Sequence, residues 1–221
     1  MNKLCLKPNP YPGKLIVFEG TDGAGKTTMI RMTAEYFARE HGEFEVVCEK
    51  QPTDLSRKTR LFQKMMYCEN HAEIDYRAVQ LLTLSDRIQH NHEVIAPSLA
   101  AGKIVICDRY IYTSLANMLA RGYRKERWFF DASRRILKPD LAFLAYAEPW
   151  LAIRRIRSRP AERDRHLNEE LLIGVSREFL RMRDTAEFEV LETDRRPDET
   201  FVRVRHRLEK LMEGKNEKRG F

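Results

Sequence analysis

The 221-residue sequence predicts an α/β fold in which a parallel five-stranded sheet carries helices on both faces. Three observations support this prediction. Short apolar strands alternate with helical segments along the chain, which is typical of a parallel sheet. A glycine-rich turn follows the first strand, and a later apolar strand ends in Asp108. Because ligands of such sheets bind beyond the carboxyl ends of the strands, the turn and Asp108 are expected to share one site.

The first expected elements surround the glycine-rich turn. Residues 14–19 are expected as a buried strand because Leu15 to Phe18 is a continuous apolar run, and residues 26–41 continue from the turn as a helix. Residues 44–48 (FEVVC) form the next expected strand. Pro52 prevents a helix in the loop that follows, since proline lacks an N–H group and restricts the residue before it. Residues 55–67 then show helical spacing.

The rest of the chain continues the alternation. A long helix is expected from Ile74 to Ala100, with Pro97 kinking or shortening it. The apolar positions on its buried side are Val79, Leu82, Ile88 and Ile95. Further strands are expected at residues 103–108, 141–146 and 188–192, where apolar runs recur. Further helices are expected at about 112–121, 125–137, 151–158, 168–183 and 197–212.

The composition indicates a globular chain with room for a sizeable core. Hydrophobic residues make up 43% and charged residues 33% of the sequence, so we expect one domain over residues 1–221 with a frayed tail at about 214–221. No apolar run approaches the ~20 residues of a membrane helix, and the start lacks the apolar core of a signal peptide. A cytoplasmic protein is therefore expected. Thiols without a disulfide or structural zinc are expected at Cys5, Cys48, Cys68 and Cys107.

The net charge of +7 has two interpretations. One is a surface that binds nucleic acid, and the other is an enzyme whose substrates are small polyanions. The densest basic run, from Arg154 to Arg165, is broken by Pro160, contains acids and has no interleaved aromatic residues. A stacking platform for bases needs such aromatics. The pattern favours small polyanionic substrates, with no nucleic-acid or membrane partner.

The glycine-rich turn has the pattern of a phosphate-binding P-loop. Gly20, Gly25, Lys26 and Thr27 fit G-x-x-x-x-G-K-[ST] between a strand and a helix. Backbone N–H groups of such a loop point at phosphate oxygens, the lysine reaches the β- and γ-phosphates, and the threonine hydroxyl can hold Mg²⁺. This predicts a nucleoside-triphosphate site. Its expected residues are Gly20, Gly23, Ala24, Gly25, Lys26, Thr27 and Thr28.

The triplet Asp108-Arg109-Tyr110 follows the apolar strand at 103–108. Asp108 can hold Mg²⁺ directly or through water, and Arg109 can clamp a second phosphate group. The alternative is that Asp108 caps the next helix and pairs with Arg109 on the surface. The position at a strand end, downstream of a P-loop, favours the site.

An arginine-rich segment, IRSRPAERDR at residues 156–165, has the composition of a lid, expected at about 157–166. Phosphoryl transfer spreads negative charge over equatorial oxygens that a closing arginine can stabilise. The variable positions of the P-loop contain no arginine, so the lid is the expected source. The candidates, which the sequence does not rank, are Arg159, Arg163 and Arg165.

The chain resembles the thymidylate kinase family over nearly its whole length. The resemblance is carried by FEGTDGAGKTT, by LLTLSDRIQHNHEVIAPSLAAGKIVICDRY and by KPDLAFLAYAEPWLAIRRIRSRPAERDR, in the family's order. It implies a P-loop fold of the nucleoside monophosphate kinase type and transfer of the γ-phosphate of ATP to the 5′-phosphate of dTMP. It also implies Mg²⁺ and a homodimer packed through long helices. Lid arginines serve those members whose P-loop has none.

By position, the resemblance assigns roles to residues of this chain. Lys26 and Thr27 serve ATP and Mg²⁺, and Asp22 faces the acceptor nucleoside and the metal. Arg109 binds the acceptor phosphate, and Arg87 reaches the pyrimidine. The residues that this assignment places at the acceptor are Asp22, Pro52, Thr83, Arg87, Arg109, Ser114 and Asn117. The metal set is Thr27, Asp108 and Asp22, and the catalytic set is Lys26, Asp22, Arg109, Arg159, Arg163 and Arg165.

The departures from the family pattern lie on the acceptor side. Thr83 stands where the family usually has a phenylalanine that stacks on thymine. Asn117 and Met118 follow Ala116 where the family usually has Tyr-Gln, and that tyrosine helps to exclude a ribose 2′-hydroxyl. Lys50-Gln51-Pro52-Thr53 replaces the usual Arg-Glu-Pro-Gly. Losing one stacking aromatic removes roughly 1–3 kcal/mol of binding.

Three functions remain open from the sequence. The first is a kinase for dTMP or a close pyrimidine monophosphate. The second is a kinase on the same scaffold for another nucleotide or a phosphorylated metabolite, with Asn117 bonding a 2′-hydroxyl. The third is a nucleotide-binding module without turnover, against which stand the retained Lys26 and Asp108 and the missing Asn-Lys-x-Asp motif of GTPases.

Overall fold

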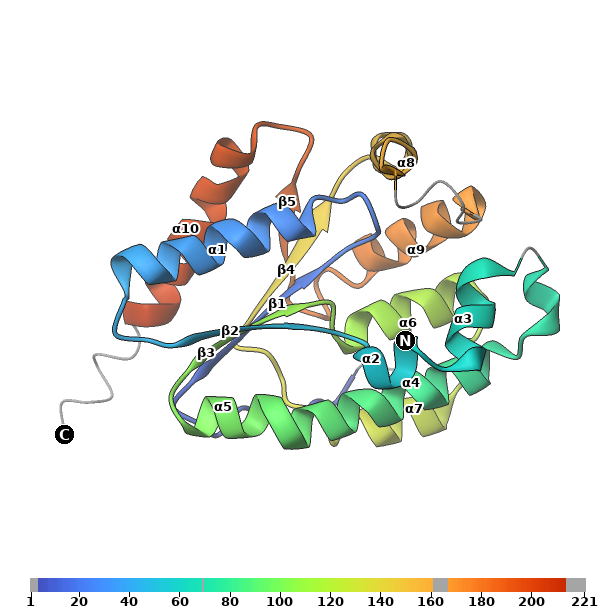
Figure 1. Ribbon diagram of the computed structural model, residues 1–221, viewed down its shortest axis with the longest axis horizontal. Coiled ribbons are helices and arrows are strands. Elements are labelled where there is room, and N and C mark those ends of the chain that lie inside the picture. The colour runs from blue at the N-terminus through green and yellow to red at the C-terminus, as the bar shows by residue number, and fades with distance from the viewer. Residues whose placement is uncertain (1–3, 69, 161–166, 214–221) are drawn as a thin grey trace.

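The sheet predicted from the sequence is present in the computed structural model, which describes residues 4–68, 70–160 and 167–213 (Figure 1). Five parallel strands lie in the order β2-β3-β1-β4-β5. Their bounds are β1 Lys14–Glu19, β2 Val46–Lys50, β3 Ile104–Asp108, β4 Leu141–Tyr146 and β5 Glu189–Glu192. The α/β fold class with an all-parallel sheet is thus confirmed.

Alternate side chains of the central strands pack into two cores, because successive residues of a strand point to opposite faces. Ile16 and Phe18 of β1 pack in one core, and Leu15 and Val17 pack in the other. All four residues are 0% exposed. The continuous apolar run therefore reflects a strand that is covered on both faces.

Helices cover both faces of the sheet (Figure 1). The core around Phe18 includes residues of α1 (Lys26–Glu40) and α10 (Pro197–Glu213). The core around Val17 includes residues of a larger group of helices, which cover the other face. The bounds in that group are α4 Tyr76–His90, α5 Ala96–Ala100, α6 Ile111–Ala120, α7 Arg127–Ser133 and α9 Glu169–Arg181.

The remaining α-helices are short. They are α2 Asp54–Arg57, α3 Arg60–Tyr67 and α8 Pro149–Arg157. The segment expected as one helix at 55–67 is in fact two, which corrects the prediction. Lys58 ends α2, and Thr59 then begins α3 as an N-cap whose hydroxyl accepts a hydrogen bond from the Phe62 N–H. Such caps satisfy N–H groups that a helix start leaves unpaired.

Other element boundaries also differ from expectation. β2 lies two residues later than 44–48, and its pairing with β3 runs to Lys50 opposite Asp108. The helix expected at 125–137 covers only Arg127–Ser133. The long helix at 74–100 continues through Pro97, because the wider π-helical turn Asn91–Ile95 precedes α5. Such a turn is one of the recurring irregularities of long helices.

Strand register brings the two predicted motifs to one edge of the sheet. Phe18 of β1 pairs with Asp108 of β3, so the P-loop and the Asp108-Arg109-Tyr110 triplet follow adjacent strand ends. Within the described ranges, no helix combines the length and apolarity needed to cross a membrane.

Candidate active site

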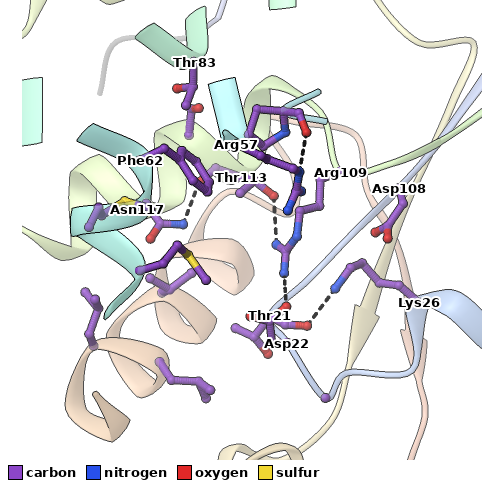
Figure 2. A pocket seen from close by; sticks show the side chains of 18 of the residues that line it. Thr21, Asp22, Lys26, Arg57, Phe62, Thr83, Asp108, Arg109, Thr113 and Asn117 are labelled. Carbon is purple, nitrogen blue, oxygen red and sulfur yellow. Dashed lines mark hydrogen bonds and ion pairs between the residues drawn. The ribbon is translucent and has the colours of Figure 1, made fainter. Parts of the chain in front are cut away.

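A cleft of about 620 Å³ opens at the carboxyl ends of β1 and β3 (Figure 2). Its walls come from the P-loop, the loop after β2, and helices α3, α4, α6 and α9. Most predicted site residues line it, namely Asp22, Gly23, Gly25, Lys26, Thr27, Thr28, Pro52, Thr83, Arg87, Asp108, Arg109, Ser114, Asn117 and Arg159. Gly20 and the buried Ala24 belong to the same P-loop turn. Arg163 and Arg165 lie outside the described residues.

Two glycines of the P-loop meet neighbouring backbone so closely that no side chain fits. Gly20 has φ +133°, and a Cβ there would lie 2.3 Å from the carbonyl oxygen of Ala145 on β4. Gly23 has φ +76°, and its Cβ would lie 2.3 Å from the carbonyl oxygen of Ala152 on α8. Glycine has no Cβ, so it alone combines a positive φ with such a close approach of neighbouring backbone. The loop is therefore clamped between β4 and α8.

Lys26 points along the inside of the P-loop. Its Nζ donates hydrogen bonds to the carbonyl oxygens of Gly20 (3.1 Å) and Thr21 (2.8 Å). Burial lowers the pKa of Lys26 to about 8; the nearby Arg109 acts in the same direction, and Asp22 oppositely. A bound phosphate group would favour the charged form of this lysine. The side chain is thus held where a polyphosphate can replace its two carbonyl partners.

Arg155 of α8 supports the P-loop from behind, which the sequence did not predict. Its guanidinium donates to the carbonyl oxygens of Gly23 (3.2 Å) and Thr193 (2.7 Å). The Thr193 hydroxyl in turn donates to the carbonyl oxygen of Ala24 at 2.9 Å. The loop after β5 and helix α8 are thereby joined to the phosphate-binding turn.

Arg109 extends from the end of β3 across the cleft toward the P-loop (Figure 2). Its guanidinium donates to Asp22 Oδ1 (2.5 Å) and to the carbonyl oxygen of Gly20 (3.0 Å). Burial acts to lower the pKa of Arg109, but the charges of Asp22, Asp108 and Glu19 outweigh it, so the pKa lies above its ordinary value. Arg109 also has φ 69°, and such backbone strain concentrates at functional sites.

Glu19 positions this arginine segment and was expected only as a strand residue. It is 0% exposed, and Oε1 accepts hydrogen bonds from the N–H groups of Tyr110 (2.9 Å) and Thr113 (3.1 Å). Oε2 accepts from the Thr113 hydroxyl at 2.5 Å. Burial raises the pKa of Glu19, and the bonds from Thr113 oppose that shift. One buried carboxyl group thus secures the start of α6 beside Arg109.

Arg57 is a further cation of the cleft, which the sequence reading missed (Figure 2). Its Nε donates to the carbonyl oxygen of Pro52 at 2.6 Å, and Nη2 donates to that of Gln51 at 3.4 Å. Burial and the charge of Arg109 lower the pKa of Arg57. No short motif marks this residue, because α2 is a four-residue helix whose orientation depends on tertiary contacts.

Asp86 anchors the loop that carries Arg57. Its Oδ2 accepts a hydrogen bond from the Thr53 N–H at 2.7 Å, and Oδ1 accepts from the Thr53 hydroxyl. Asp86 is 2% exposed and lies next to Arg87 in α4. The Gln51–Pro52 peptide bond within this loop is cis. The loop therefore reaches the cleft in a conformation that α4 determines.

The far wall of the cleft combines α3, α4 and α6. Asn117 donates from Nδ2 to the carbonyl oxygen of Thr113 (2.9 Å), and its Oδ1 accepts from Arg121 Nη1 (2.8 Å). The Arg121 guanidinium lies 3.8 Å from the centre of the Tyr76 ring, a cation–π contact. The amide oxygen of Asn117 is therefore already paired, and Asn117 faces the cleft mainly through its remaining N–H.

Phe62 of α3 supplies an aromatic ring to the same wall, which the sequence reading also missed. It is 7% exposed and lines the cleft, with its ring centre 5.9 Å from Cζ of Arg57 (Figure 2). Thr83, the position without the expected aromatic residue, is 3% exposed and lies in α4. An aromatic ring is thus present near the acceptor side, but from a different helix.

The oxygen ligands of the cleft fit a magnesium ion shared with phosphates. Asp108 Oδ1 is buried and has no hydrogen-bond partner within the described residues, while the Thr27 hydroxyl group belongs to an exposed residue of the cleft. Magnesium prefers a few such oxygen ligands together with water and substrate phosphates. Asp22, the third candidate, already pairs with Arg109.

Taken together, the cleft has two cationic parts, and Arg109 interacts with both. The P-loop with Lys26 forms one part, and Arg57 with Arg109 forms the other. Preorganised cations and backbone N–H groups of this kind stabilise the charge that develops during phosphoryl transfer. The arrangement can hold a triphosphate and a phosphorylated acceptor side by side.

Comparisons with known proteins point to one family. A family model described as "Thymidylate kinase" matches residues 18–204. A probable thymidylate kinase of Thermococcus kodakarensis is 40% identical over 172 residues, covering 76% of this chain and 82% of the relative. A thymidylate kinase of Desulfotalea psychrophila is 36% identical over 169 residues, covering 76% and 81%.

The solved structures confirm the fold. The crystal structure of thymidylate kinase from Ehrlichia chaffeensis superimposes with a TM-score of 0.66 and 24% sequence identity. The match covers 89% of this chain and 100% of that chain. At this identity the likeness concerns the fold alone.

Proposed function

The chain belongs to the thymidylate kinase family, and we propose that it transfers the γ-phosphate of ATP to the 5′-phosphate of dTMP within the cleft of Figure 2. The family's reaction is the ATP-dependent phosphorylation of dTMP to dTDP. One observation carries the proposal for this chain. Arg109 is held by Asp22 and by the Gly20 carbonyl oxygen of the P-loop, and its charge also acts on Arg57. Phosphoryl transfer depends almost entirely on such positioning and charge stabilisation.

On the donor side, the P-loop binds the triphosphate and Lys26 binds its β- and γ-phosphate groups. Lys26 exchanges its carbonyl partners for the β- and γ-phosphate oxygens, an exchange that restores full charge to a lysine whose pKa burial has lowered to about 8. Thr27 and Asp108 would hold Mg²⁺, which supplies further neutralisation of phosphate charge. Asp22 serves this site through Arg109.

On the acceptor side, Arg109 and Arg57 bind the 5′-phosphate of dTMP. Arginine suits this task because its planar guanidinium group matches phosphate oxygens in pairs. Arg87, Thr83, Ser114 and Asn117 surround the nucleoside, together with Phe62. The phosphate oxygen of dTMP is thereby directed at the γ-phosphorus, with Glu19 maintaining the backbone that carries Arg109.

The proposal also includes a lid, a homodimer, a single domain and a cytoplasmic location. Arg159 lines the cleft at the start of the proposed lid, and the contributions of Arg163 and Arg165 fall outside the described residues. A homodimer is supported by Leu81, an apolar residue that is 55% exposed on α4. The single-domain organisation over residues 1–221 and the cytoplasmic location are also proposals, and light scattering of the purified protein tests the dimer.

The test is ADP release from ATP and Mg²⁺ with a panel of acceptors, using Lys26→Ala as the blank. The panel contains dTMP, dUMP, dCMP, UMP, CMP, AMP, GMP and no acceptor. We expect dTMP to give the highest kcat/KM. Higher turnover with UMP or CMP would refute dTMP as the acceptor and favour a ribonucleotide that the remaining N–H of Asn117 recognises. If ATP binds but no compound on this or a wider metabolite panel is phosphorylated, the result would favour a non-catalytic nucleotide-binding module.

A further inference from the structure

Two polar atoms of α4 are buried at the cleft without a hydrogen-bond partner. Gln80 is 2% exposed and Arg87 is 1% exposed, and both residues line the cleft. Over the part of the chain that the structure describes, Gln80 Oε1 and Arg87 Nε are buried polar atoms with no partner. Folded proteins pair nearly all such atoms, so an unpaired acceptor and an unpaired donor in one binding cleft point to a ligand.

The two side chains lie on the same face of the helix. Residues seven apart are separated by two turns, and Thr83 lies between them on that face. The Thr83 hydroxyl donates to the Gln80 carbonyl oxygen (3.3 Å), and Arg87 Nη1 donates to the Thr83 carbonyl oxygen (3.1 Å). The threonine therefore directs its polar group at the backbone. A short side chain at this position leaves two longer polar side chains to border the cleft.

The unpaired atoms have complementary chemistry. Gln80 Oε1 can accept one hydrogen bond, and Arg87 Nε can donate one. The Gln80 amide donates a hydrogen bond to the Tyr76 hydroxyl oxygen. Burial raises the pKa of Tyr76, and this hydrogen bond opposes the shift. The amide is thus oriented by Tyr76 with its oxygen left over. A ligand edge that offers both an N–H group and a carbonyl oxygen would satisfy the two unpaired atoms.

We propose that Gln80 accepts a hydrogen bond from the N3–H group of the acceptor pyrimidine while Arg87 Nε donates to a neighbouring carbonyl oxygen. The inference rests on the proposed function, since it requires a pyrimidine nucleotide in this cleft. Gln80 is then a specificity-determining residue of the acceptor site. It provides by hydrogen bonding part of the base recognition that an aromatic residue at position 83 would provide by stacking.

The same pair distinguishes a thymine or uracil edge from a cytosine edge. Cytosine has an acceptor at N3 and an amino group at C4. Rotating the Gln80 amide would satisfy that N3, but it would break the contact with Tyr76, and Arg87 would still face the amino group with a donor. Arg87 keeps its charge for this role, because burial lowers its pKa only to about 10, with Glu19 and Asp86 opposing the shift. Buried polar groups left unpaired are the strongest source of such discrimination.

The test compares dTMP with its N3-methyl analogue, which lacks the N3–H donor. Wild-type enzyme should prefer dTMP in kcat/KM by at least about tenfold, which corresponds to about 1.4 kcal/mol. In Gln80→Ala, which removes the acceptor and makes room for the methyl group, this preference should fall to within about threefold. Gln80→Met keeps the side-chain volume and should raise the KM for dTMP without changing the KM for ATP. Thermal melting confirms that both variants fold.

The matched control is Gln89→Ala, because Gln89 is an exposed residue of the same helix. It should retain the wild-type preference. A preference for dTMP that persists in Gln80→Ala, or a wild-type enzyme that uses both nucleotides equally well, would overturn the role of Gln80 and leave the proposed function intact. A wild-type enzyme with no turnover of dTMP would refute the proposed function, and the base contact with it.

Discussion

Replacing Arg57 with methionine should weaken the binding of the acceptor phosphate and leave ATP binding unchanged. Arg57 lies in the cleft close enough to Arg109 for the two charges to influence each other, and Phe62 lies beside it with its ring centre 5.9 Å from Cζ. A hydrogen bond to a charged group contributes about 1.5–3 kcal/mol. The kcat/KM for dTMP should therefore fall roughly 10- to 150-fold.

The difficulty is that Arg57 also holds its own loop, through the carbonyl oxygens of Pro52 and Gln51. Binding of dTMP and of unphosphorylated thymidine, measured by calorimetry, separates the two roles. If Arg57 binds the phosphate, the variant loses affinity for dTMP but not for thymidine. Equal losses for both ligands would show that Arg57 only shapes the loop, and the proposed phosphate contact would be wrong. Arg60→Met, at an exposed position at the start of α3, is the matched control.

Three further predictions follow from the same geometry. Because burial lowers the pKa of Lys26 to about 8 and only the protonated form attracts phosphate, kcat/KM for ATP should fall as the pH rises through about 8; a flat profile up to pH 9.5 would contradict this. Gly23→Ala should abolish ATP binding because its Cβ meets the Ala152 carbonyl oxygen, whereas Gly102→Ala, at nearly the same φ but with nothing within 4 Å, should cost only about 1 kcal/mol in urea unfolding; similar losses would refute the steric argument. Glu19→Gln should lower the free energy of unfolding by about 1–3 kcal/mol because three hydrogen-bond donors depend on that carboxyl group, and the exposed Glu43→Gln should have little effect in the same urea titration.

Local patterns were sufficient to predict the sheet and the glycine-rich turn after β1. The apolar runs of β1 and β4 begin and end where the sequence places them, because a strand covered on both faces must be apolar throughout. The P-loop also follows from residue spacing, since Gly20, Lys26 and Thr27 lie close together in the sequence. In both cases the residues that interact are near one another in sequence.

The acceptor side could not be predicted in the same way because its parts come from distant segments. Arg57 approaches Arg109 only because Asp86 of α4 holds the Thr53 loop, across 33 residues of sequence. Phe62 reaches the cleft only because Thr59 interrupts the expected helix and starts α3 in a new direction. Neither contact leaves a periodic or motif signal. The missing aromatic at position 83 was visible, whereas the ring from α3 was not.

Helix α4 carries both the residues that face the proposed base site and a residue that holds the loop after β2. Its successive turns present Gln80, Thr83 and Arg87 to the cleft, while Asp86 holds the acceptor loop. Just beyond its end, Asn91 accepts a hydrogen bond from the Tyr110 hydroxyl at 3.0 Å, which links the helix to the residue after Arg109. A change at position 83 would therefore alter the proposed base site and leave these two contacts in place. Because Asp86 and Asn91 rather than Thr83 make these contacts, base recognition in this chain can change independently of the residues proposed to bind phosphate.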